Sequence, residues 1–133
     1  MNTKEIIIKT AKKQEFRNIT EQLKVLLKSA QIKNGMAVIT TQHTTAGLTI
    51  NENADINVTG DIGNFLNETI PVTNKFKHIE GNSDAHIKSS LFGVSLTVII
   101  EDGKFLLGVW QGIYFCEFDG PRERKIKVKF IAG

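Results

Sequence analysis

The chain is poor in the residues that mark disulfide-stabilised, proline-rich and aromatic-rich proteins. Its 133 residues include one cysteine, two prolines, one tryptophan and one tyrosine. Because Cys116 is alone, it cannot form an internal disulfide, and a reducing cytoplasm is the expected location. The rest of the composition, 41% hydrophobic and 23% charged, is typical of a globular protein and not of a disordered one. We therefore expect one cytoplasmic domain over residues 1–133.

Long hydrophobic runs are also missing. No stretch approaches the roughly 18 consecutive apolar residues that a membrane-spanning helix needs. The N-terminal segment, "MNTKEIIIKTAKKQEF", lacks both the continuous apolar region and the small-residue cleavage site of a secretory signal. Neither a membrane partner nor a signal peptide is therefore expected.

The net charge of +3 gives only a mild basic bias. The densest basic segment is "RERKIKVKF", residues 122–130, in which lysines alternate with apolar residues. This period of two predicts a strand with one solvated face. No aromatic residue interleaves on the lysine face, as base stacking on single strands would favour. A nucleic-acid partner is therefore not expected.

Hydrophobic periodicity predicts several strands and two or three helices without strict βαβ alternation, which indicates an α+β fold. Asp102-Gly103, between two apolar runs, predicts a hairpin turn. Asn18 or Thr20 is the expected cap of the first helix. The expected helices cover residues 18–35, 56–70 and 84–93, and the expected strands cover 5–10, 36–43, 94–101, 104–109, 112–118 and 125–131.

The stretch "QHTTAGLTINENAD", residues 42–55, is unusually dense in hydrogen-bonding and ionisable side chains. Asn and Asp at its end are also the ordinary turn and cap residues before a helix, so a purely structural role stays open. The polar side chains that make it a candidate site are His43, Thr44, Thr45, Asn51, Glu52, Asn53 and Asp55.

The chain has three histidines, and none lies in an obvious core stripe. Three imidazoles would suit a catalytic zinc site, which has three protein ligands and an open position. The spacing of His43, His78 and His86 matches no established metal motif, and by itself it favours three unrelated histidines. A histidine oriented by Asp84 or Glu52 could instead move protons without a metal.

Two other positions allow more than one reading. Cys116 lies in the middle of an apolar strand pattern, where a thiol is inert, so we interpret it as a core residue. Trp110 and Gln111 lie in "LGVWQGIY". They would either pack against the protein or form the wall of a ligand pocket with one polar group.

Three stretches follow one another along almost the whole chain: "QHTTAGLTINENAD", "HIEGNSDAHIKSSLFGVSL" and "LLGVWQGIYFCEFDGPRERKIKV". Together they resemble the YjbQ family of small bacterial and archaeal proteins. His78, Glu80-Gly81 and the "AHIK" run at 85–88 reproduce the middle signature of that family. Val109 stands where the family has Thr in "GTWQGIY", which removes a hydroxyl from a potential ligand contact.

The resemblance implies an α+β fold built on a mixed or antiparallel β-sheet sandwich, assembled as a homotrimer with clefts near subunit boundaries. It implies that His43, His78 and His86 form a histidine cluster around a divalent metal, zinc or magnesium. His43, His86, Glu52 and Asp84 would be catalytic. The residues expected to bind substrate are Thr44, Thr45, Asn51, Asn53, Asp55, Lys88, Trp110 and Gln111.

The activity that the resemblance implies is that of a secondary thiamine-phosphate synthase, which joins a pyrimidine diphosphate to a thiazole phosphate. Loss of pyrophosphate requires cationic groups or a metal, and Lys88, with Arg122 or Arg124 as weaker candidates, would supply positive charge. No glycine-rich phosphate loop is visible in the sequence. The alternatives are a non-catalytic trimer that binds a metal or an anion, and a trimer with a structural or interaction role.

Overall fold

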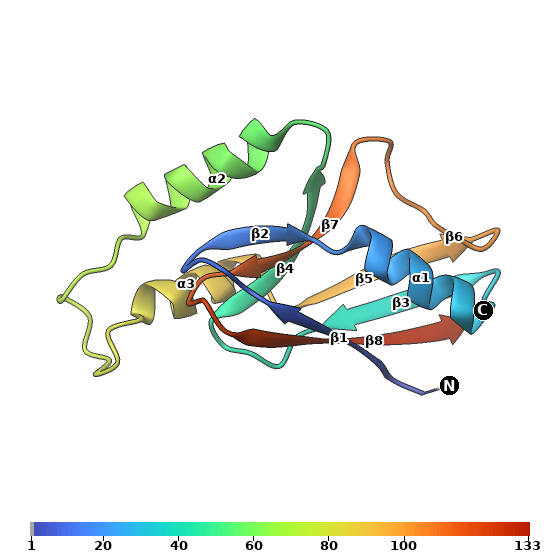
Figure 1. Ribbon diagram of the computed structural model, residues 1–133, viewed down its shortest axis with the longest axis horizontal. Helices are drawn as coiled ribbons and strands as arrows, with labels where there is room; N and C mark the ends of the chain where they lie inside the picture. The colour runs from blue at the N-terminus through green and yellow to red at the C-terminus, as the bar shows by residue number, and fades with distance from the viewer. Residues whose placement is uncertain (1) are drawn as a thin grey trace.

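The computed structural model describes residues 2–133, which form three helices and eight strands (Figure 1). This arrangement confirms the expected α+β class. The elements, in chain order, are β1 (Lys4–Lys9), β2 (Glu15–Asn18), α1 (Thr20–Ala30), β3 (Gly35–Thr40), β4 (Ala46–Glu52), α2 (Ile56–Thr69), α3 (Ser83–Phe92), β5 (Ser95–Glu101), β6 (Lys104–Phe105), β7 (Gln111–Glu117) and β8 (Glu123–Ala132).

The strands form two antiparallel sheets. The larger sheet has five strands in the order β1-β8-β3-β5-β6, and the smaller has three in the order β2-β7-β4. The main hydrophobic core contains inward-facing side chains of both sheets together with α1, so the expected sheet sandwich is confirmed. In this core Ile39 of β3 lies opposite Val128 of β8, while Leu48 of β4 lies opposite Phe115 of β7.

The central strand of the smaller sheet, β7, is buried on both faces. Ile113 and Phe115 point into the main core between the sheets. Tyr114, Cys116 and Phe118 point the other way, into a second cluster that α2 and α3 cover. Cys116 is therefore a core residue as predicted, and its burial raises the pKa of the thiol and keeps it protonated.

The outer face of the larger sheet is exposed, because alternate side chains of β1, β5 and β8 lie outside the core. Along β8, Lys125 and Lys129 point outward while Ile126 and Val128 are buried, which confirms the predicted strand with one solvated face. The outer face also carries an apolar patch at neighbouring register positions of β3, β5 and β8, namely Met36, Ile99 and Ile131.

Some predicted boundaries were wrong. The strand predicted over 104–109 is limited to β6, because the chain then turns and the side chain of Gln111 accepts a hydrogen bond from the Gly108 amide at 2.8 Å. The first helix ends at Ala30 and not near Asn34, because Gln31 adopts a left-handed conformation with φ 56°. Its start lies close to the expected one, but the expected cap was wrong: Ile19 is the N-cap residue and provides no side-chain cap, while Asn18 Oδ1, one residue earlier, accepts a hydrogen bond from the Thr20 amide.

Strands β2 and β4 were not predicted from the sequence. The helices α2 and α3 match the expected segments closely, and Gly93, with φ 87°, follows the end of α3. No helix among residues 2–133 is both long enough and apolar enough to cross a bilayer.

Candidate functional site

The polar stretch 42–55 spans the length of one strand, so its two ends lie far apart. Thr45 directly precedes β4, and Glu52 is its last residue. At about 3.3 Å per strand residue, the seven steps between them cover roughly 23 Å. The predicted site residues therefore form two groups in the chain. We call them the histidine end, with His43 and His86, and the far end, with Asn53, Trp110 and Gln111.

A cavity of about 680 Å³ lies at the histidine end, and we call it the histidine pocket. The loop between β3 and β4 contributes His43 and Thr44, and α3 contributes His86, Ser89 and Ser90. The histidine pocket thus brings two of the three predicted histidines to one surface. Its size lies within the range of roughly 300–1,000 Å³ that small-molecule sites show.

Close packing of α3 against β4 creates one wall of the histidine pocket. The hydroxyl of Ser89 donates a hydrogen bond to the carbonyl of Ala46 at 2.6 Å. A Cβ at Gly47 would lie 2.9 Å from Cβ of Phe92 and 3.0 Å from the carbonyl oxygen of Gly93. Glycine at position 47 therefore lets the end of α3 approach the strand, which holds His86 beside the 43–45 segment.

The imidazole of His43 is held by the backbone of β8. The Lys125 amide donates a hydrogen bond to Nε2 of His43 at 3.0 Å, so Nε2 is unprotonated and the neutral ring carries its proton on Nδ1. Burial lowers the pKa of His43, and the nearby charge of Arg124 lowers it further, while the charge of Glu117 opposes this shift only in part. His43 is therefore neutral at pH 7.

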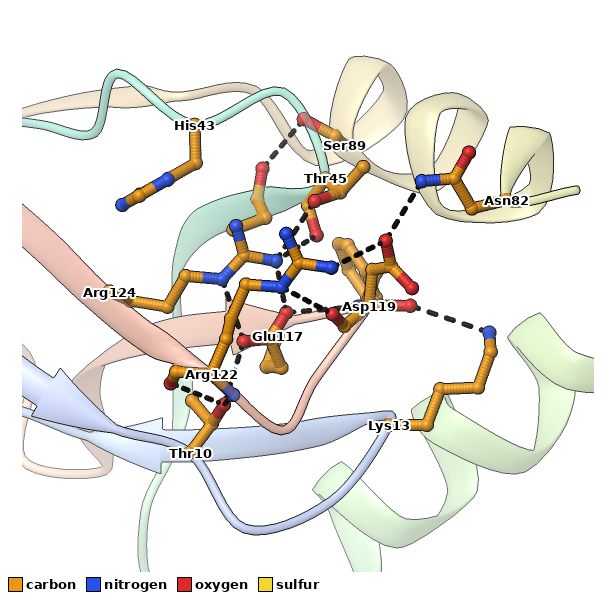
Figure 2. A network of polar contacts seen from close by, with 12 residues as sticks. Thr10, Lys13, His43, Thr45, Asn82, Ser89, Glu117, Asp119, Arg122 and Arg124 are labelled. Carbon is orange, nitrogen blue, oxygen red and sulfur yellow. Dashed lines mark hydrogen bonds and ion pairs between the residues drawn. The ribbon is translucent and has the colours of Figure 1, made fainter. Parts of the chain in front are cut away.

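Beneath the 43–45 segment lies a buried ion pair between Arg124 of β8 and Glu117 of β7 (Figure 2). Nε of Arg124 donates to Glu117 Oε2 at 2.7 Å, and Nη2 of Arg124 contacts Oε1 of the same carboxylate. Nη2 also donates to the carbonyl and hydroxyl oxygens of Thr45, at 3.2 and 2.9 Å. Arg124 is 1% exposed, so this pair joins both sheets to the 43–45 segment out of contact with solvent.

The Glu117 carboxylate has further donors. Thr10 Oγ1 donates to Oε2 at 2.8 Å, and the Asp119 amide donates to Oε1 at 2.9 Å. Burial by itself would raise the pKa of Glu117, but the hydrogen bonds from Arg124, the Asp119 backbone and Thr10 outweigh it and hold the pKa below its ordinary value. Glu117 is therefore ionised, and its charge is fully compensated.

His78 and His86 are neighbours, with ring centroids 5.3 Å apart and an interplanar angle of 88°. Nε2 of His78 lies 3.9 Å from Oε1 of Glu80. Among residues 2–133, no three His, Cys, Asp or Glu side chains are placed so that they could hold a metal ion together. One chain therefore offers a histidine pair, and the three-histidine metal centre stays a prediction.

Asp84 and Lys88 lie on the buried side of α3, away from the histidine pocket. The Lys88 ammonium donates to Gln14 Oε1 and Asn67 Oδ1, each at 2.8 Å, and burial lowers its pKa. Asp84 Oδ2 accepts from Lys13 at 2.8 Å. Both side chains are 1% exposed, so the expected contacts of Lys88 and Asp84 with substrate stay predictions.

Oδ1 of Asp84 and Oδ1 of Asn82 are buried and have no hydrogen-bond partner among residues 2–133. Nδ2 of the Asn82 side chain donates to Asp119 Oδ2 at 2.8 Å, and Arg122 pairs with the same carboxylate at 3.1 Å (Figure 2). The start of α3 is therefore linked to the β7–β8 turn by a polar network.

At the far end, the turn over residues 108–111 precedes β7 and lies against Asn53, the residue that follows β4. The Asn53 amide donates to the Trp110 carbonyl at 2.9 Å, and its side chain donates to the Gln111 carbonyl at 3.3 Å. Trp110 is 62% exposed, so its ring does not pack into the core of the chain. A Cβ at Gly112 would lie 2.9 Å from Cβ of Asn53, which explains glycine after Trp110-Gln111.

The remaining predicted residues of the far end serve local structure. Asp55 caps α2 by accepting a hydrogen bond from the Asn57 amide at 2.9 Å, which is the structural alternative considered for it. Asn51 Oδ1 accepts from the amide of Glu52. Asn53 and Gln111 line a separate cavity of about 330 Å³. In one chain, these residues do not reach the histidine pocket.

Sequence reasoning missed Glu117 and gave Arg124 only a minor role. A signal for both exists in the strand alternation. Glu117 has the same parity as the core residues Ile113 and Phe115, and Arg124 has the same parity as Ile126. Opposite charges on the inward faces of two strands that pack together indicate a buried ion pair.

The comparisons with known proteins agree along the whole chain. The family described as "UPF0047 protein YjbQ-like" matches residues 4–133. UPF0047 protein MJ1081 of Methanocaldococcus jannaschii is 58% identical over 124 residues, which cover 93% of this chain and 90% of that protein. UPF0047 protein YugU of Bacillus subtilis is 47% identical, with 96% and 98% of the two chains covered.

Solved structures show the same fold. A crystal structure of a YjbQ/UPF0047 family protein from Clostridium acetobutylicum has a TM-score of 0.93 and 53% identity, covering 96% of this chain and 98% of that one. A hypothetical protein from Aeropyrum pernix has a TM-score of 0.95 at 30% identity, with both chains fully covered. The sandwich and its three helices are therefore shared with proteins of distant organisms.

Proposed function

The chain belongs to the YjbQ-like UPF0047 family, and from this premise we propose that it is a small-molecule enzyme that acts on a phosphorylated substrate in the histidine pocket. The reaction would resemble that of a secondary thiamine-phosphate synthase. The observation that carries the proposal is the pairing of His43 and His86 in one cavity of about 680 Å³ that hydroxyl groups also line. Imidazoles and hydroxyls together suit proton transfer and the binding of phosphate oxygens.

The two histidines would have different roles. His43 uses Nε2 to accept the Lys125 amide, so it would contribute Nδ1–H as a hydrogen-bond donor to an anionic oxygen. His86 makes no side-chain hydrogen bond among residues 2–133 and lies beside His78, so it would be the group that accepts or releases a proton. The buried Arg124 would act as a positioning residue through Thr45.

In the proposed reaction, the C–O bond to the diphosphate of the pyrimidine substrate breaks and the diphosphate leaves with the bonding electron pair. The thiazole nitrogen then attacks the same carbon and forms the new C–N bond. The new charge lies on the leaving group, so donors aimed at it lower the barrier. Arg122, which is exposed and paired with Asp119, would be the arginine that donates to the leaving diphosphate.

The proposal includes a divalent ion, zinc or magnesium. His78 and His86 are suitable imidazole donors, but residues 2–133 of one chain do not complete a three-ligand set. The remaining ligands would come from a neighbouring subunit or from the substrate phosphates. When bound, such an ion would offset the charge of a departing diphosphate.

We also propose that the protein works as a homotrimer. A head-to-tail ring places a different surface of each subunit at the shared boundary. Such a ring would bring the far end of one chain, with Trp110 and Gln111, to the histidine pocket of the next. The exposed Trp110 and the apolar patch of Met36, Ile99 and Ile131 support an assembly, because large apolar side chains gathered on a surface favour contacts between proteins.

The test is turnover of a pyrimidine diphosphate with a thiazole phosphate, followed by mass spectrometry of the product. We expect His86→Gln to lose at least about 100-fold in turnover, the lower range for general acid–base catalysis. Lys129→Gln, on the outer face of β8, is the control and should retain activity.

Three other results are informative. Wild-type protein that binds the diphosphate saturably through His86 but turns nothing over would establish the non-catalytic binding alternative. Equal turnover by His86→Gln and wild type would refute the assigned role of the histidine pocket. Absence of both binding and turnover would refute the proposal for this substrate class.

A further inference from the structure

A second cavity, of about 750 Å³, lies at the C-terminal end of α1, against the hairpin that joins β5 and β6. We call it the lysine pocket. Figure 1 shows α1 and β6 at the opposite end of the molecule from α3, so the lysine pocket is distant from the histidine pocket. Nothing in the proposed reaction uses it.

The floor of the lysine pocket is apolar. Leu27, Ile32 and Phe105 line it and are 3%, 6% and 9% exposed. These side chains come from α1, from the segment after it and from β6. The left-handed conformation of Gln31 turns the chain at the end of α1, so that Ile32 folds back beneath the helix. A ligand in this cavity would therefore cover apolar surface that is already fixed by the core.

The rim of the lysine pocket has charge of one sign. Lys24, Lys28, Lys33 and Lys104 line it, and no carboxylate does. Lys24 pairs with Glu21 at 3.4 Å, whereas the other three lysines have no ion-pair partner among residues 2–133.

Lys33 and Lys104 are the two lysines best placed to bind an anion. Lys28 is in the last turn of α1, where its charge partly offsets the negative end of the helix dipole. Lys33 and Lys104 lie beyond the helix and are not used in this way. The Gly103 amide donates to the Lys33 carbonyl at 2.8 Å, and Gly103 has φ 74°, which fixes the hairpin turn against the segment that carries Lys33. The two lysines therefore belong to backbones that are tied to each other.

We propose that the lysine pocket is a binding site for a small organic anion with an apolar body, such as an aryl or acyl phosphate, carboxylate or sulfonate. The apolar floor takes the body, and the lysines take the acidic group. The lysine pocket shares Lys24 and Phe105 with the cavity at the far end, so a longer ligand extends toward Asn53 and Gln111. This proposal stands independently of the proposed enzyme activity.

The test uses two fluorescent probes with nearly the same aromatic body. One is 8-anilinonaphthalene-1-sulfonate, which is anionic, and the other is N-phenyl-1-naphthylamine, which is neutral. We expect the anionic probe to bind several-fold more tightly, and its binding to weaken as salt is added. The variant Lys33→Gln/Lys104→Gln should weaken the anionic probe about fivefold and leave the neutral probe unchanged, in keeping with modest surface charge contacts.

The control variant is Lys9→Gln/Lys129→Gln, which removes the same charge from exposed positions of β1 and β8. It should bind the anionic probe as wild type does. Amide chemical shifts locate the probe: changes centred on Gly103 and Lys33 support the proposal. Changes centred on Ile99, in the apolar patch of the outer sheet face, or equal loss of affinity in the two double variants, would overturn it.

Discussion

The two ends of the molecule differ in how they hold charge. At the histidine end, Arg124 and Glu117 are buried between the sheets and are neutralised by each other. At the lysine pocket, charged side chains of one sign are exposed around an apolar floor. Burial makes the first pair a structural element that holds the 43–45 segment through Thr45, whereas exposure leaves the lysines free for a ligand. Charged side chains therefore hold the structure at one end and are placed for binding at the other.

The strongest way to break this comparison is to unpair the buried charges. Arg124→Met should lower the free energy of unfolding by about 3–5 kcal/mol, because it leaves Glu117 buried without its counter-ion. Urea denaturation followed by circular dichroism measures the effect. The double variant Arg124→Met/Glu117→Leu should recover most of the loss. A single variant as stable as the wild type would show that the pair is not buried as described.

A second buried charge allows a smaller change at the same end. Lys88→Met should cost about 1–3 kcal/mol, because Gln14 and Asn67 lose their shared donor and Asp84 loses a neighbouring positive charge. Hydrogen exchange of α2 amides is the specific readout, since Asn67 belongs to α2 and accepts a hydrogen bond from Lys88. Unchanged α2 protection would contradict this role of Lys88.

The pH dependence of stability sharpens the comparison further. Glu117 has a folded-state pKa below its ordinary value of 4.5, so it contributes stability above that pH and loses it as the pH falls through the folded-state pKa. The pKa of His43 in the folded protein is below its ordinary value of 6.5. As the pH falls below 6.5, the unfolded chain therefore binds a proton at His43 before the folded protein does, and the stability falls here too.

Urea denaturation between pH 3 and pH 7 tests both contributions. Stability should fall with decreasing pH, and the part below about pH 4.5 should be absent from Arg124→Met/Glu117→Leu. The part that begins near pH 6.5 should be absent from His43→Gln. An unchanged profile in both variants would mean that other carboxylates determine acid unfolding.

The smallest effect is expected at the other end. Lys33→Gln/Lys104→Gln should change the free energy of unfolding by no more than about 0.5 kcal/mol, because both side chains are exposed and have no ion-pair partner among residues 2–133. The same urea denaturation measures this. A loss of several kcal/mol would show that these lysines support the fold and would remove the contrast between the ends.

The sequence predicted the elements with strong periodicity and missed those with mixed composition. Helix α3 and strand β5 have clear boundary residues, and their positions were correct. Strand β4 was missed because its second half, "TINE", is largely polar, while its first half is short and is defined by its pairing with β7 and its packing in the core. Pairing between strands that are about 65 residues apart is a tertiary effect that local patterns do not contain.

The histidines of the candidate site could be named from the sequence, but the arrangement of the site depends on tertiary contacts. The resemblance to a family drew attention to His43, His78 and His86, and the structure places His86 in one cavity with His43 and next to the ring of His78. The separation of the 42–55 stretch into two ends followed only from the extended conformation of β4. Lys88 was expected to face a substrate, but its burial under α2 depends on contacts with Gln14 and Asn67 that no sequence pattern shows.

The hydrogen bond from Lys125 to His43 has a consequence for mutational scanning. Its donor is a main-chain amide, so every residue except proline supplies it. An alanine scan would record position 125 as tolerant and would overlook its contribution to the histidine. Only Lys125→Pro, or replacement of the amide by an ester through chemical synthesis, would expose the interaction. The backbone of β8 thus determines the tautomer of His43, and most substitutions at position 125 leave it unchanged.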